Sequence, residues 1–156
     1  MCQTSCMHSD SETTIKDLKD LLVEFRNERD WAQFHDPKNL AEAISIEAAE
    51  LLELFLWKSS DASTQQLESN ETFRKGVEEE LADVFCFCLN FANATGIDVA
   101  SVVANKIADN RIKYPIEKAR GKATKYNGLY PRPSAQCSGR YIRTQWFHLL
   151  GRYTEA

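Results

Sequence analysis

Apolar residues recur at spacings of three and four along most of this chain, which is the period of an α-helix. The first such stretch predicts a helix over residues 14–30, with Ser11 or Thr13 as its N-cap. Its apolar stripe consists of Ile15, Leu18, Leu22 and Phe25. Residues 31–39 form a connection interrupted by Pro37. A second helix is predicted over residues 39–57, with Asn39 as its cap and an apolar stripe of Leu40, Ile44, Leu51 and Leu54.

The helical pattern continues after a polar break. Residues 59–70 are rich in serine and predict a loop, and loops beside functional sites often act as lids. A third helix is predicted over residues 71–95, ended by Gly96, and its apolar second half predicts burial on nearly all sides. A fourth helix is capped by Asp98 and stops before Pro115. Since almost nothing reads as a strand, we predict an all-α fold, a bundle of four helices.

Composition and charge restrict the class of protein. A chain of 156 residues with 43% hydrophobic content predicts one domain. The net charge of −4 and the pI near 5.4 argue against nucleic acid as the main partner. Among five cysteines, Cys86 and Cys88 lie in an apolar helical stretch, where buried free thiols are expected and no zinc motif fits. With no signal-like start and no membrane-spanning segment, we predict a cytoplasmic protein without a membrane partner.

The composition changes after the fourth helix. Residues 116–128 are basic and contain glycines, whereas residues 129–156 carry Pro131 and Pro133 and then aromatic and arginine residues. The second of these segments looks appended to the main domain. We therefore predict a flexible N-terminus over residues 1–13, a main domain over 14–128 and a C-terminal extension over 129–156.

Two pairs of acidic residues are the most informative feature of the chain. Glu47 and Glu50 lie three apart in the second predicted helix. Glu80 and Asp83 lie three apart in the third. Each pair shares a helix face and sits among apolar residues, so a cation would compensate the cost of partial burial. Magnesium prefers oxygen ligands and retains waters and substrate phosphates, so the pairs predict metal-assisted phosphate chemistry.

These carboxylates have alternatives to a magnesium site. Acidic pairs are common on solvated helix faces, and periodicity alone cannot choose among Glu78, Glu79 and Glu80. Glu53 is a further candidate, as a third ligand, a base or a plain surface residue. A ferritin-like di-iron bundle would need Glu-x-x-His pairs, and the histidines lie outside these motifs.

The fourth predicted helix offers a candidate phosphate site. Lys106, Asn110 and Lys113 or Tyr114 share one face, with Arg111 beside them. An ordinary solvated helix end would carry similar lysines, which the helix dipole favours. The aromatic residues Trp31, Trp57 and Phe87 could stack on a base or could belong to the core.

Three stretches resemble the MazG-like family of all-α nucleoside triphosphate pyrophosphohydrolases, and within it the dCTP pyrophosphatase group. They read ERDWAQFHDPKNLAEAISIEAAELLELFLWK (28–58), EEELADVF (78–85) and KIADNRIKYPIEKARGKATKY (106–126). An E-x-x-E is thus followed about thirty residues later by E-x-x-D and then by K-x-x-x-N-x-x-x-Y-P. The resemblance covers roughly three quarters of the chain and selects Glu80 with Asp83 from the acidic run.

The resemblance implies hydrolysis between the α and β phosphates of a nucleoside triphosphate, with nucleotide-pool cleansing as the role. It implies Mg²⁺, with Mn²⁺ as a substitute, and assembly as a homodimer or homotetramer. The implied metal ligands are Glu47, Glu50, Glu80 and Asp83. Glu47 or Glu50 would be the catalytic base. The implied substrate-binding residues are Trp31, Trp57, Phe87, Lys106, Asn110, Arg111 and Tyr114.

Some positions depart from the group's pattern. Phe87 stands where the group has a tyrosine, Leu22 where animal members have a histidine, and Ala108 where an acidic residue is usual. Each departure removes a polar group near the nucleotide, which affects base preference. Two alternatives to an enzyme remain. One is a nucleotide-sensing module without catalysis, although all four carboxylates are present, and the other is a helical interaction protein.

Overall fold

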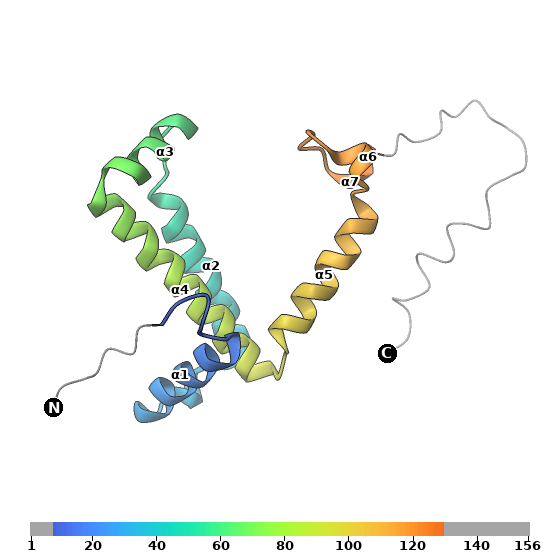
Figure 1. The fold of residues 1–156 in the computed structure, drawn as a ribbon. Helices are drawn as coiled ribbons and strands as arrows, with labels where there is room; N and C mark the ends of the chain where they lie inside the picture. The colour runs from blue at the N-terminus through green and yellow to red at the C-terminus, as the bar shows by residue number, and fades with distance from the viewer. Residues whose placement is uncertain (1–7, 130–156) are drawn as a thin grey trace, which may run out of the picture. The chain divides into compact units, whose positions relative to one another are not determined.

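The computed structural model describes residues 8–129, and within them it contains helices and no strand, which confirms the all-α prediction (Figure 1). The helices are α1 (Ile15–Glu28), η1 (Trp31–Phe34), α2 (Pro37–Glu53), α3 (Ser60–Ser69), α4 (Glu71–Thr95), α5 (Val99–Lys113), α6 (Ile116–Ala119) and α7 (Tyr126–Leu129). The predicted C-terminal extension lies outside the described residues except for Leu129.

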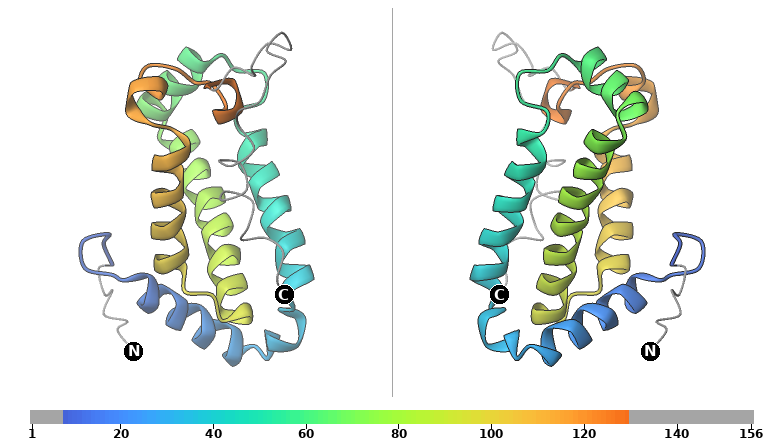
Figure 2. Two further views of the ribbon diagram at one scale, coloured as in Figure 1. Left: turned by 90° about the vertical axis from the view of Figure 1, so that its right-hand side faces the viewer. Right: turned by 90° about the vertical axis from the view of Figure 1, so that its left-hand side faces the viewer.

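The chain divides into two units, residues 1–107 and 108–156. Helix α5 crosses this boundary, so a single bundle of four helices stays a prediction. The first unit holds η1 and α1 to α4. In it, α2 and α4 run side by side and make the most extensive contact, while α1 lies across one end of α4 (Figure 2). Two hydrogen bonds fix that crossing: Asn93 Nδ2 donates to the Lys19 carbonyl at 3.0 Å, and Lys19 Nζ donates to the Ile97 carbonyl at 3.1 Å.

The start of α1 differs from the prediction. Thr14 is the N-cap, not Ser11 or Thr13. The Asp17 backbone N–H donates to Thr14 Oγ1 at 3.2 Å, and the Thr14 N–H donates to the Asp17 carboxylate at 2.8 Å. This reciprocal capping box satisfies two backbone donors at once. The prediction was wrong because a hydroxyl cap is favoured most where an acidic residue lies three positions later, and among Ser11, Thr13 and Thr14 only Thr14 meets that condition, with Asp17.

Helix α2 begins and ends earlier than predicted. Asp36 is its cap, accepting from Lys38 N at 2.9 Å and Asn39 N at 3.0 Å, so the prediction of Asn39 as cap was wrong. Pro37 occupies the first turn, where its missing N–H costs nothing. The helix ends at Glu53, before Trp57, whose φ of 62° lies in the left-handed region.

Residues predicted to be a loop form α3, and that prediction was wrong. Ser59 caps the helix by accepting from Ala62 N at 3.2 Å. Ser63 and Ser69 donate their hydroxyls to carbonyls four residues back, at 2.9 and 2.7 Å. These bonds let a serine-rich segment stay helical, and contact with α4 supports it.

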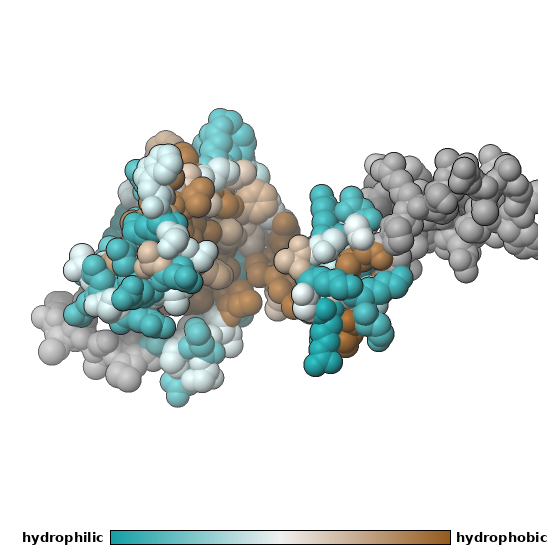
Figure 3. Space-filling view, turned by 90° about the horizontal axis from the view of Figure 1, so that it is seen from above, coloured by the Kyte–Doolittle hydropathy of each residue, from teal (hydrophilic) through white to brown (hydrophobic). Residues whose placement is uncertain are grey.

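Helix α4 matches its predicted range. Asn70 caps it by accepting from Phe73 N at 3.0 Å, and Gly96 ends it with φ of 68°. Among the residues that the structure describes, the buried ones are Leu40 of α2 and Leu89, Asn90 and Ala92 of α4. Burial on nearly all sides is not observed in the single chain, because Phe85 is 60% exposed. Hydrophobic side chains accordingly reach the surface (Figure 3).

Within residues 8–129, no single helix has the length and apolar character needed to cross a membrane. Helices α4 and α5 satisfy that test only when they are taken together as a bent pair.

Candidate functional site

Three carboxylates from two helices meet in the first unit. Glu47 of α2 and Glu80 and Asp83 of α4 each place an oxygen within 4.8 Å of the others. Glu80 and Asp83 share a face because they lie three apart in a helix, and α2 packs along α4, which brings Glu47 to that face. We call these three residues the acidic cluster.

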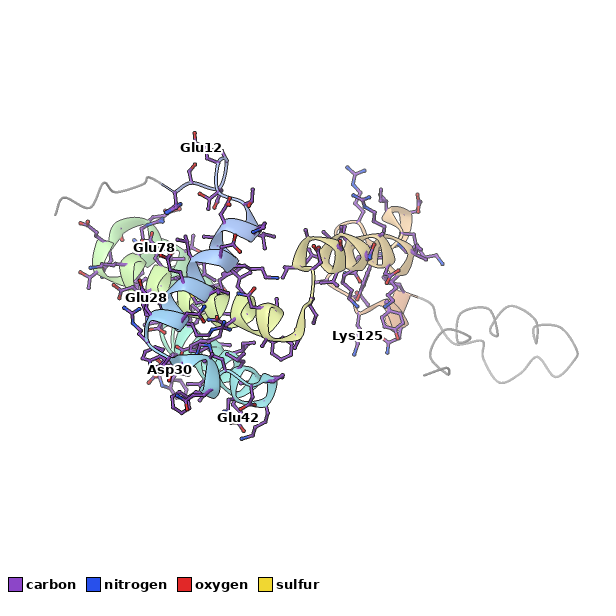
Figure 4. All side chains as sticks on the ribbon, turned by 90° about the horizontal axis from the view of Figure 1, so that it is seen from below. Glu12, Glu28, Asp30, Glu42, Glu78 and Lys125 are labelled. Carbon is purple, nitrogen blue, oxygen red and sulfur yellow. The ribbon has the colours of Figure 1, made fainter. Side chains whose placement is uncertain are left out.

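Ion pairs along α4 distinguish Glu80 from its acidic neighbours Glu78 and Glu79. Glu78, labelled in Figure 4, places its Oε1 3.7 Å from Arg74 Nη1, and Glu79 places its Oε1 3.8 Å from Lys75 Nζ. Each basic partner lies one helical turn earlier. Within residues 8–129, no basic side chain forms an ion pair with a member of the acidic cluster. The geometry therefore supports the choice of Glu80 over Glu78 and Glu79 as a candidate ligand.

Desolvation and then repulsion between neighbouring carboxylates raise the pKa values of both glutamates of the acidic cluster. Partial burial raises the pKa of Glu47, and the nearby charges of Glu50, Asp83 and Glu80 add to the effect. Glu80 likewise has a raised pKa, first through desolvation and then through Glu50 and Asp83. Glu50 is not one of the three converging residues, but its carboxylate is close enough to act on both glutamates.

A hard divalent cation would relieve this repulsion. The converging ligand atoms are all carboxylate oxygens, with no imidazole or thiolate among them, which suits Mg²⁺ or Mn²⁺ better than a softer metal. Three protein oxygens also leave coordination positions for water or a phosphate. Glu53 lies at the end of α2 and is not part of the acidic cluster.

A pocket of about 650 Å³ lies beside the acidic cluster and shares Asp83 with it. Its walls come from α1, η1, the segment that follows η1 and α4. They comprise Leu21, Leu22, Glu24, Phe25, Arg26, Glu28, Trp31, His35, Asp83, Cys86, Phe87 and Asn90. Glu28, at the end of α1, is labelled in Figure 4. Trp31 is held edge-on against Phe25, with ring centroids 5.9 Å apart.

The pocket gathers some of the predicted substrate-binding residues and not others. Trp31 and Phe87 both line it, and so does Leu22. Trp57 does not line it and is 94% exposed, so this side chain is not part of the core of the described chain. The alternative of a core role for Trp57 was therefore wrong.

Two polar side chains of the pocket were not predicted from the sequence. Asn90 is only 7% exposed, and its Oδ1 has no hydrogen-bond partner in the described part of the chain; the same holds for His35 Nδ1. Burial lowers the pKa of His35, and the Arg26 charge lowers it further. The sequence held one weak signal for Asn90, an amide in an apolar helical run that it shares with Asn93. His35 lies in the connection between two predicted helices, where no periodicity marks it.

The candidate phosphate residues fall on both sides of the boundary between the units. Lys106 belongs to the first unit, whereas Asn110, Arg111 and Tyr114 belong to the second. In the second unit, the Tyr114 ring meets Tyr126 edge-on, with centroids 6.4 Å apart. The role of these four residues stays a prediction.

Comparison with known proteins identifies relatives of this chain. Residues 43–129 match the model of the MazG-like family. The chain is 40% identical to dCTP pyrophosphatase 1 of Rattus norvegicus over 119 residues, covering 76% of this chain and 69% of the rat protein. It is 39% identical to dCTP pyrophosphatase 1 of Homo sapiens over 118 residues, covering 76% and 69% of the two chains.

Among solved structures, a pyrophosphatase from Archaeoglobus fulgidus is 42% identical, with a TM-score of 0.61. The match covers 70% of this chain and 98% of the archaeal chain. The family match spans more than half of the sequence and includes the whole acidic cluster. The chain therefore belongs to the MazG-like family.

Proposed function

We propose that this protein hydrolyses (deoxy)nucleoside triphosphates between the α and β phosphates, with magnesium, and favours dCTP-like substrates. The chain is a nucleoside triphosphate pyrophosphohydrolase, as its dCTP pyrophosphatase relatives indicate. The observation that carries the proposal is the position of Asp83, which belongs both to the acidic cluster and to the wall of the pocket. A triphosphate at the acidic cluster would thus place its base in the pocket.

The reaction needs a water, a base and a leaving group. Water attacks the α phosphorus, the bond from that phosphorus to the bridging oxygen breaks, and pyrophosphate leaves. Glu47 or Glu50 accepts the proton of the attacking water. Glu47, Glu50, Glu80 and Asp83 would hold the metal, which, when bound, neutralises the phosphate charge and lowers the pKa of the water.

The remaining predicted residues bind the substrate in this proposal. Trp31 and Phe87 stack on the base. Trp57, predicted as a further aromatic wall, lies outside the pocket of its own described chain and keeps that role only as a proposal. Lys106, Asn110, Arg111 and Tyr114 hold phosphate and sugar. Assembly as a homodimer or homotetramer is supported by large apolar side chains left exposed on α2 and α4, which a second subunit would cover. They are Ile46, Leu52, Leu81 and Phe85.

A panel of nucleoside triphosphates tests the proposal. Each is incubated with the protein and Mg²⁺, and pyrophosphate and monophosphate are quantified, with EDTA as the metal-free control. We expect stoichiometric release from dCTP that EDTA abolishes. Tight dCTP binding without turnover would instead favour a nucleotide-sensing module, and neither binding nor turnover would favour a helical interaction protein.

A further inference from the structure

Asn90 occupies an unusual position for an amide side chain. It is one of the buried residues of the first unit, and its Oδ1 lacks a hydrogen-bond partner within residues 8–129. A buried carbonyl oxygen without a donor destabilises the protein that contains it. Because Asn90 lines the pocket, a donor brought by a ligand would remove that penalty.

The spacing along α4 matches the length of a nucleotide. Asp83, Phe87 and Asn90 lie at intervals of four and three residues, so they share one face of the helix. Seven residues of α-helix span roughly 10 Å. This is comparable to the distance from the α phosphate to the far edge of a pyrimidine base. With the phosphates at Asp83 and the ring against Phe87, the edge of the base would reach Asn90.

Resting on the function proposed above, we propose that Asn90 Oδ1 accepts a hydrogen bond from the exocyclic amine of the base and thereby selects aminopyrimidine nucleotides. His35 also lines the pocket, and its Nδ1 is the other buried polar side-chain atom without a partner within residues 8–129. A neutral imidazole can donate or accept at this nitrogen, according to its tautomer. His35 can therefore either accept from or donate to a base in the pocket, whereas the Asn90 carbonyl requires a donor.

The test compares dCTP with the triphosphate of the 2-pyrimidinone deoxyriboside, in which hydrogen replaces the 4-amine. The wild-type protein should prefer dCTP in kcat/KM by about 5- to 150-fold, the factor expected when a buried acceptor stays unpaired. Asn90→Leu should reduce this ratio to about one by losing activity toward dCTP alone. Asn90→Leu should also melt at or above the wild-type temperature without nucleotide, because it removes an unpaired carbonyl.

Asn93→Leu is the matched control. Asn93 lies three residues further along α4, outside the pocket, and its Nδ2 donates to the Lys19 carbonyl. This variant should keep the wild-type ratio even if it melts earlier. If Asn90→Leu does not fold, Asn90→Ala measures the same ratio.

The outcomes separate the two proposals. A wild-type protein that releases pyrophosphate from no nucleotide would remove the proposed function itself. An active wild-type protein that treats dCTP and the analogue alike would overturn the role of Asn90 and leave the function intact. The same conclusion would follow if an Asn90 variant kept the full preference for dCTP.

Discussion

Replacing Trp31 by alanine probes the pocket most directly. The indole lines the pocket and meets Phe25 edge-on at 5.9 Å. It is 44% exposed, so a large part of its surface is available to a ligand. In the proposed function, this ring stacks on the base, and Trp31→Ala removes the stacking surface while leaving the acidic cluster in place.

The expected magnitude has two parts. Aromatic stacking on a base contributes about 1–3 kcal/mol in single-strand binding proteins, and the same range for a mononucleotide raises KM for dCTP roughly 5- to 150-fold. Loss of the edge-on contact with Phe25 removes about 0.5–1.5 kcal/mol beyond the loss of buried area. We therefore expect a large change in KM, a nearly constant kcat and a modest fall in melting temperature.

Initial rates of pyrophosphate release over a range of dCTP concentrations separate KM from kcat. Phe34→Ala is the matched control, because Phe34 is another large aromatic residue of η1, is 59% exposed and does not line the pocket. It should leave KM near the wild-type value. If Trp31→Ala kept the wild-type KM, stacking on Trp31 would be refuted, and the indole would be only a packing partner of Phe25.

Three further predictions concern other parts of the chain. Glu50→Gln should keep the fold but lower activity by orders of magnitude, because a neutral amide weakens divalent binding; near-normal turnover would remove Glu50 from the site. Burial lowers the pKa of His35 in the folded protein, so on acidification the unfolded chain binds a proton at this imidazole first. The free energy of unfolding should therefore fall as the pH drops through the ordinary histidine pKa toward the lower pKa of the folded state. In His35→Gln, the melting temperature should change less between pH 7.5 and 5 than in the wild-type protein. An unchanged pH dependence would contradict the assigned role of His35. Cutting the chain after Gly128 should spare catalysis and alter melting temperature or oligomer size, whereas a folded but inactive truncation would show that residues 129–156 complete the site.

The sequence predicted those parts of the fold that depend on local signals. Asn70 and Gly96 bound α4 as short-range capping rules require, and the helix has its predicted range. The loop prediction for the segment of α3 was wrong because the preference of serine for loops is a tendency that local hydrogen bonds and packing can override. The bonds of Ser63 and Ser69 to carbonyls four residues back satisfy their hydroxyls inside a helix once α4 provides a packing surface.

The candidate site shows the same division between local and long-range information. The spacing of Glu80 and Asp83 is local, and it indicates a shared face without any knowledge of packing. The pocket is not local, because it arises where α1 crosses α4, and no periodicity specifies that crossing. Asn90 was missed for this reason: nothing in the sequence distinguishes it from Asn93 in the same apolar run, and only the packing of α1 reveals the cavity beside it.

The departures from the dCTP pyrophosphatase pattern become more informative once the pocket is known. Leu22 stands where the resemblance gives animal members a histidine, and Phe87 where it gives the group a tyrosine; both line the same cavity as Asn90 and His35. By the pattern that the resemblance implies, the pocket carries two apolar side chains in place of polar ones, and Asn90 and His35 contribute its buried, unpartnered polar atoms. A site discriminates among ligands through the polar groups it would leave unpaired, more than through its apolar walls. Base selection in this chain should accordingly depend on Asn90 and His35, with Leu22 and Phe87 contributing shape.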